Sequence, residues 1–143
     1  MSVALAIAGS AIFLFLGLAH TVFSLQSQPD RGPLMPTNPD VRTAMQQVGG
    51  LGMAPDIDSS LYRAWIGFNL SHSLGIVAIA GVLLANITTG LDAAVGQVWF
   101  LVLVALVPPL YLYLAVKYWF DKPRDGIALA TILLWAGVIF ELL

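Results

Sequence analysis

Four segments of this chain contain no Asp, Glu, Lys or Arg, and they limit what the chain can fold into more than any other feature. A helix needs about 20 apolar residues to cross the roughly 30 Å of hydrocarbon in a bilayer. Three of the segments exceed that length, and the fourth spans if Glu141 and the carboxylate of Leu143 lie in the headgroup layer. The segments are Met1–Pro29, Ala64–Leu91, Ala93–Val116 and Gly126–Phe140.

The composition is that of a membrane protein. The chain is 59% hydrophobic and 10% charged, whereas a soluble domain has roughly 25% charged residues. We therefore predict an all-α fold, a four-transmembrane-helix bundle forming a single domain, with spans at about 3–27, 60–87, 94–119 and 125–142. The first span is interpreted as a permanent helix, because no Lys or Arg precedes it and it is longer than the apolar core of a signal peptide.

The first loop, about residues 28–60, carries the signals of one short helix. Asn38 is a suitable N-cap, Pro39 suits the first helical position, and Gly49-Gly50 suits the end. Apolar residues recur at helical spacing at Val41, Ala44, Met45 and Val48. We predict a helix at about 39–48 that lies along the cytoplasmic interface. A lid over a cytoplasmic-side pocket and a docking site for another subunit are the alternatives.

The basic residues predict the orientation. Four spans place the first and third loops on one side of the membrane, and all six basic residues belong to these loops or their edges: Arg31, Arg42, Arg63, Lys117, Lys122 and Arg124. By the positive-inside rule both loops are cytoplasmic and both termini lie outside the cytoplasm. The expected location is the inner (plasma) membrane of a cell, as a multi-pass protein.

Small and polar residues share one face of each of the first two spans. At 100° per residue this face of the first span holds Gly9, Ser10, Phe13, Gly17, His20, Thr21 and Ser24. On the second span His72 lies between the small residues Gly67, Ser71 and Gly75 and the polar residues Asn69 and Ser73. Because small residues let membrane helices approach closely, Gly67, Ser71 and Gly75 are predicted to form a packing face. Ile66, Leu70, Leu74 and Val77 are then expected on the lipid side.

The two histidines are predicted to occupy one polar layer in the cytoplasmic half of the bundle. Counting from the helix ends at 1.5 Å per residue places His20 about 10 Å deep and His72 about 15 Å deep. Pro108 and Pro109 fall near the same depth and free the carbonyls of Val104 and Ala105 from helical hydrogen bonds. Tyr111, Thr131 and Trp135 come from similar depth. The candidate ligand-binding residues are His20, Asn69, His72, Ser73, Pro108, Tyr111 and Trp135.

Several interpretations of this layer stay open. In the structural one, both histidines are neutral, bond neighbours such as Ser24, Asn69 or Ser73, and hold the helix register. In the others, the layer binds a quinone, a lipid or a small apolar molecule beside the Pro108-Pro109 kink, or both histidines ligate one b-type haem, or the pair relays protons. No other cofactor and no protein-held metal ion is predicted.

Other classes of function are disfavoured by what the sequence lacks. It has no H-E-x-x-H, nucleophile elbow, P-loop or G-x-G-x-x-G motif, and no carboxylate falls in the polar layer. There is no cysteine, and a net charge of −2 without a basic tract argues against nucleic acid as a partner. We predict a non-catalytic integral membrane protein, an accessory or structural subunit of a larger complex or a homo-oligomer. The alternative is a small binder of quinone, lipid or b-type haem at His20 and His72.

A resemblance supports this class. The runs Gly17-Leu18-Ala19-His20, Asp40-Val41-Arg42-x-Ala44-Met45 and Arg63–Gly75 resemble those of uncharacterised small bacterial inner-membrane proteins of about this length. More distantly the chain looks like the four-helix DoxX-like group. The close resemblance covers most of the first two spans and their loop, whereas the second half is similar only in hydropathy. It implies a bacterial four-helix bundle and no established activity or ligand.

Overall fold

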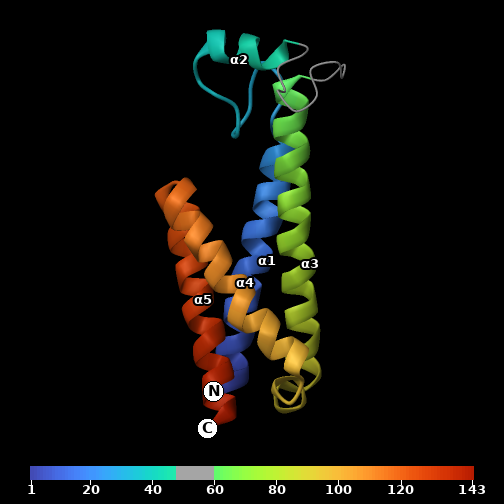
Figure 1. Ribbon diagram of the computed structural model, residues 1–143, viewed down its shortest axis with the longest axis vertical. Coiled ribbons are helices and arrows are strands. Elements are labelled where there is room, and N and C mark those ends of the chain that lie inside the picture. The colour runs from blue at the N-terminus through green and yellow to red at the C-terminus, as the bar shows by residue number, and fades with distance from the viewer. Residues whose placement is uncertain (48–59) are drawn as a thin grey trace. The chain divides into compact units, whose positions relative to one another are not determined.

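A computed structural model of the chain describes residues 1–47 and 60–143, and in this part it is helical. Four of its helices are long and apolar enough to cross a membrane, which confirms the all-α fold of an integral membrane protein. The only β-type pairing in the described part is an isolated bridge between Gln28 and Arg31. The helices are α1 (Ser2–Gln26), α2 (Pro39–Gln46), α3 (Leu61–Val95), α4 (Val98–Tyr118) and α5 (Asp121–Leu142) (Figure 1).

The helices contribute to two compact units. The first contains residues 1–16 and 76–143, and the second contains residues 17–75. Both α1 and α3 therefore begin in one unit and end in the other. Each unit is described separately below.

In the first unit α1 and α5 are antiparallel, and their backbones touch. A Cβ atom placed on Gly9 would lie 2.5 Å from the Leu134 nitrogen, and one on Gly137 would lie 2.5 Å from the Ala6 nitrogen. Contacts this short exclude any side chain at either position. Because the start of α1 lies beside the end of α5, both chain termini lie at the same end of this unit (Figure 1).

Two apolar clusters fill the first unit around this contact. One is centred on Leu83, Ile87, Phe100 and Leu134, all at most 2% exposed. The other contains Phe13, Ile76, Ala80, Ala115, Ile127 and Ala130. Both clusters draw on all four long helices, so removing any one of these helices would expose the side chains of the others.

Helix α3 runs further than the predicted span. It reaches Val95 rather than residue 87, with one non-helical residue, Gly90, at φ 158° and ψ 106°. Near the predicted end, Asn86 and Thr89 bond back to the carbonyls of Val82 and Ala85. The chain is kinked at Gly90, so α3 consists of two helical segments, and the first of them ends close to the predicted residue 87.

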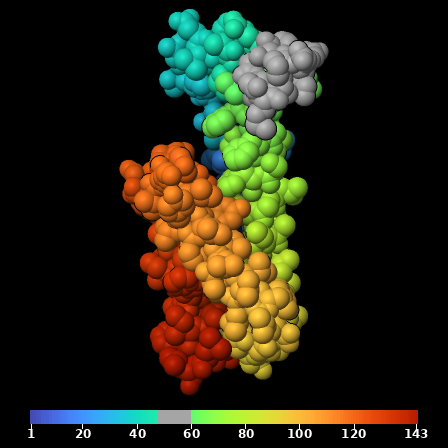
Figure 2. All heavy atoms as spheres, in the orientation of Figure 1, coloured from blue at the N-terminus to red at the C-terminus, as the bar shows by residue number. Residues whose placement is uncertain are grey.

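Helix α4 contains Pro108 and Pro109 and packs against α5. Figure 2 shows the atoms of α4 and α5 in contact on one face of the molecule. The indole nitrogen of Trp135 on α5 donates a hydrogen bond of 2.8 Å to the carbonyl of Val104. This is one of the carbonyls that lose their helical partner to the prolines, so the neighbouring helix supplies the missing donor.

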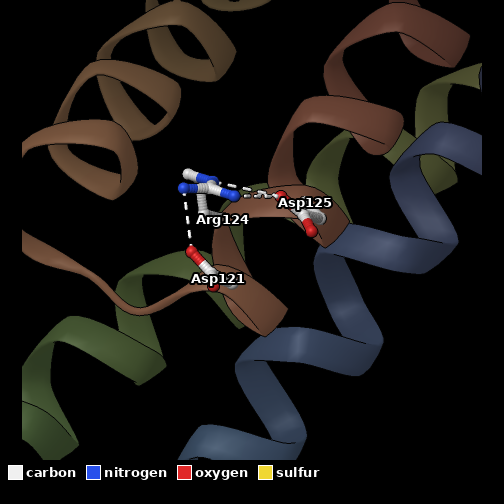
Figure 3. Close-up of polar contacts among 3 residues, drawn as sticks. All are labelled: Asp121, Arg124 and Asp125. Carbon is white, nitrogen blue, oxygen red and sulfur yellow. Dashed lines mark hydrogen bonds and ion pairs between the residues drawn. The ribbon is translucent and has the colours of Figure 1, made fainter.

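Helix α5 begins one turn before the predicted span. Its first turn is charged, and Arg124 bonds Asp121 at 2.9 Å and Asp125 at 3.0 Å (Figure 3). Pro123 is tolerated there because the first N–H groups of a helix have no intrahelical acceptor. Both aspartates are well exposed, so solvent screens these ion pairs and they contribute little to stability.

In the second unit, Ser27 links the loop to both helix ends. Its hydroxyl donates to the Phe23 carbonyl and accepts the Leu34 N–H, and its carbonyl accepts the hydroxyl of Tyr62. The Trp65 indole also donates to the Leu34 carbonyl at 3.2 Å. The part of the loop after α1 is therefore tied to the first turns of α3 by side chain to backbone hydrogen bonds.

The predicted start of the loop helix is confirmed. The Asn38 side chain accepts the Asp40 N–H at 2.8 Å, and Pro39 occupies the first helical position. The helix ends at Gln46, before the predicted end at 48, and residues 48–59, which include Val48 and Gly49-Gly50, lie outside the described residues. Met45 is buried, whereas Val41 remains 44% exposed. Its position at a membrane interface stays a prediction.

Candidate functional site

The candidate site is a group of polar and aromatic side chains from α1 and α3 in the second unit. His20 Nε2 lies 2.9 Å from Asn69 Oδ1, and the Asn69 amide nitrogen donates to the Trp65 carbonyl at 2.7 Å. A carbonyl only accepts hydrogen bonds, so the second bond fixes the orientation of the Asn69 amide. Its oxygen then faces His20, and Nε2 of His20 carries the proton and donates. In a neutral His20 the lone pair is therefore on Nδ1.

The second histidine contacts the first through its ring. The His20 and His72 ring centroids are 5.8 Å apart at an interplanar angle of 80°, an edge-to-face arrangement. On its other side the His72 ring stacks with Phe68, at 6.1 Å and 13°. The two rings are therefore neighbours on two helices, whereas a shared ligand site at one membrane depth stays a prediction. Phe68 was not anticipated, although its spacing of four residues from His72 places both on one helix face.

The hydroxyl groups near the histidines bond the backbone of their own helices. Ser24 donates to the carbonyl of His20 at 2.8 Å, and Ser73 donates to the carbonyl of Leu70 at 3.0 Å. Both residues are buried, and such back-bonding satisfies a hydroxyl in apolar surroundings. Of the three neighbours considered as partners for a histidine ring, the structure shows the bond with Asn69.

The predicted packing face at Gly67, Ser71 and Gly75 needs correction. Gly67 and Ser71 are exposed, and a Cβ placed on Gly67 would meet no described atom within 4 Å. The buried face of α3 is rotated toward Asn69, Ser73, Ile76 and Ala80. The small residues do recur at helical spacing, but α1 packs against the neighbouring polar side of α3, which carries Asn69 and Ser73. The hydrogen bond of Asn69 holds α1 on that side, away from the glycine side.

The remaining candidates, Pro108, Tyr111 and Trp135, belong to the first unit. Pro108 and Tyr111 line a cavity of about 10 Å³ with Phe13, Ile76 and other apolar side chains. This volume holds at most one water molecule, so this cavity beside the proline kink has no room for a quinone. Trp135 supports helix packing through its bond to Val104.

At the His20–His72 pair the structure shows one hydrogen bond and two ring contacts. Among residues 1–47 and 60–143, no three His, Asp or Glu side chains are grouped so that they could hold a metal ion. The nearest polar partner is a neutral amide, which neither removes a proton nor stabilises a cation as a carboxylate does.

The four long apolar helices define the class as an integral membrane protein. Comparison of the chain with models of known protein families, with curated proteins and with solved structures finds no match.

Proposed function

We propose that the protein is a non-catalytic component of a bacterial inner membrane, an accessory or structural subunit of a larger membrane complex. The observation that supports this proposal best is the chain of hydrogen bonds from His20 through Asn69 to the Trp65 carbonyl. It uses the polar groups of the candidate site to join α1 to α3. Buried polar groups that bond one another in this way stabilise a helix pair and leave few groups for a reaction.

The outer faces of the long helices supply the surface for lipid or a partner. Large apolar side chains are exposed along them, including Phe15 at 68%, Phe68 at 65%, Leu74 at 67% and Ile132 at 64%. In a bilayer such side chains face lipid tails or another membrane protein at little cost. A subunit role is therefore compatible with the surface of every long helix.

The proposal is tested by native mass spectrometry of the tagged chain, purified from its own membranes in two different mild detergents. We expect the chain in a complex with another membrane protein at one fixed ratio in both detergents. The subunit role is contradicted if the chain is monomeric in both detergents and cross-linking in intact membranes also captures no partner protein. If the complexes contain only further copies of the chain, the protein is a homo-oligomer and not a subunit of a larger complex.

The orientation is part of the same proposal, with both termini outside the cytoplasm. It is supported by the six basic residues, which all flank the first and third loops. A C-terminal alkaline phosphatase fusion should be active and a C-terminal fluorescent-protein fusion should be dark. The reverse pair of results places the termini in the cytoplasm.

A second candidate function, a small binder of haem, quinone or lipid, is favoured by one observation. Two imidazole rings from different helices lie with centroids 5.8 Å apart, so one ligand can contact both. The fit to haem is incomplete, because Nε2 of His20 already donates to Asn69. Ligation through that nitrogen would require His20 to leave Asn69.

The visible absorption spectrum separates the two candidates. The subunit role predicts a colourless preparation whose spectrum shows no Soret shift when haem is added. A Soret band that His20→Leu and His72→Leu each abolish would favour the binder. For quinones and lipids, organic extraction of the purified chain and mass spectrometry should show one compound that is lost in both variants.

A further inference from the structure

The adjacent prolines of α4 leave two carbonyl oxygens without their helical partners, and the structure treats the two differently. A helical carbonyl accepts the N–H four residues ahead, or three ahead in a tighter turn. For Val104 the residue four ahead is Pro108, and the Trp135 indole supplies the donor instead, at 2.8 Å. The prolines also keep the next carbonyl, that of Ala105, from its helical donor.

Ala105 has neither helical option. Four residues ahead is Pro109 and three ahead is Pro108, and neither has an N–H group. Within the part of the chain that the structure describes, no side-chain hydrogen bond ends on the Ala105 oxygen. Ala105 is the eighth residue of the 21 in α4, about 11 Å from the start of the helix. If α4 spans the bilayer as proposed, that depth lies in hydrocarbon without bulk water, where an unpaired carbonyl is costly.

Ala105 also lines a groove between α4 and α5 with a volume of about 260 Å³, together with Leu101, Val104, Trp135, Val138 and Ile139. Every one of these side chains is apolar except for the indole N–H of Trp135. That N–H is already bonded to Val104. The α4–α5 groove therefore combines an apolar lining with a backbone acceptor and has no free side-chain donor.

We propose that the α4–α5 groove binds a long-chain lipid alcohol, whose hydroxyl donates to the Ala105 carbonyl and whose apolar body covers Trp135 and Ile139. A ketone, quinone or ether has no hydrogen to donate, so it leaves the Ala105 oxygen unpaired. A charged amine has donors but must lose its hydration in an apolar groove. The volume is slightly below that of pockets for drug-sized ligands, so the groove holds the hydroxyl end of the molecule and not all of it.

The test uses a matched pair of photoreactive probes with the protein in lipid vesicles. One is a long-chain alcohol with a diazirine near its hydroxyl, and the other is its methyl ether, which has the same chain and no donor. Labelled residues are located by mass spectrometry. The alcohol should label residues 101–105 and 135–139 about two- to tenfold more than the ether does, the ratio that corresponds to one net hydrogen bond.

Two proline variants separate the hydrogen bond from the shape of the groove. Pro109→Ala gives the Ala105 oxygen an N–H within its own helix, so the preference for the alcohol over the ether should disappear. Pro123→Ala, in the first turn of α5, is the control. It also replaces a proline by alanine but gives the Ala105 oxygen no donor, so the preference for the alcohol should remain.

Three results would overturn the proposal: equal labelling of the groove by alcohol and ether, labelling mainly outside residues 101–105 and 135–139, or an unchanged preference in Pro109→Ala. If Pro109→Ala closes the groove by straightening α4, labelling by both probes falls. In that case Ala105→Leu, which fills the groove and keeps both prolines, is the deciding variant. The proposal requires it to abolish the preference for labelling by the alcohol over the ether. Cross-links between groove residues of two copies would instead assign the groove to self-association.

Discussion

The two halves of α1 are held by different physical means. Its first half, in the unit of residues 1–16 and 76–143, touches α5 through Gly9 and Gly137 with no side chain between the backbones. Its second half, in the unit of residues 17–75, is joined to α3 by the bond between His20 and Asn69. Lipid tails are as apolar as leucine, so membrane helices associate through close packing and hydrogen bonds. One helix of this chain uses both.

The difference teaches where the chain tolerates change. A close backbone contact tolerates no added atom. A hydrogen bond between side chains can be removed without a steric clash, and in a membrane it contributes only a modest free energy to stability. We therefore expect the glycine contact to be the more sensitive of the two. Four substitutions or cycles test this comparison, from the largest expected effect to the smallest.

Gly9→Leu or Gly137→Leu should have the largest effect. Either side chain would meet the facing backbone, which cannot move aside as a side chain can. Overpacking usually costs about 1–3 kcal/mol, and we expect the upper end of that range or loss of the fold. Thermal unfolding in detergent measures it. Gly81→Leu is the control, because a Cβ there meets nothing within 4 Å among the described residues. Equal losses for Gly9 and Gly81 would contradict the assigned α1–α5 contact.

The bond between His20 and Asn69 should come second. In a cycle of His20→Leu, Asn69→Leu and the double variant, the coupling energy should be about 0.6–1.7 kcal/mol, the range of such bonds in membranes. His72→Leu should couple to Asn69→Leu by less, because the contact of His72 with His20 is through the rings. The free energy of unfolding in mixed micelles measures both. Additive effects of His20 and Asn69 would show that the bond contributes nothing to stability.

The Trp135 bond should come third. Trp135→Phe removes the donor to the Val104 carbonyl, at an expected cost of about 1 kcal/mol for the bond in addition to the lost volume. In a Pro108→Ala background the helix supplies its own N–H to Val104, so the same substitution should cost less. Chemical denaturation measures the loss in free energy of unfolding caused by Trp135→Phe in each background, and the difference between the two losses is the contribution of the hydrogen bond. No difference would mean that the indole acts by its volume alone.

Gly67→Leu should have the smallest effect, within about 0.5 kcal/mol for the isolated chain. The position is exposed, and a Cβ there meets no described atom. Equilibrium unfolding measures the effect, and Gly9→Leu in the same detergent is the reference. A loss at Gly67 as large as that at Gly9 would show that this face of α3 packs against something outside the described contacts, a second copy or a partner included.

Much of the fold was predictable because hydropathy and charge act locally. The four spans, the start of the loop helix at Asn38 and Pro39, and the loss of helical bonds at Val104 and Ala105 depend only on residue types and their spacing. The small and polar face of α1 was also predictable, since Gly9, Ser10, Phe13 and Ser24 are buried as helical periodicity places them. The continuation of α3 beyond residue 87 was not, because a second helical segment follows the kink at Gly90.

The sequence by itself determined that the chain forms four long helices apolar enough to cross a membrane, and it predicts that two histidines lie at similar depth. Only the tertiary structure decided that the histidine rings meet, that Asn69 is the partner of His20, and which glycines lie in contacts. Gly9, Gly67 and Gly137 look alike in sequence, because glycine has no side chain to mark what it faces. Their environments differ by the rotation of each helix about its own axis. Long-range partners such as Asn69 and Trp135 set that rotation, and their contacts do not appear in local periodicity.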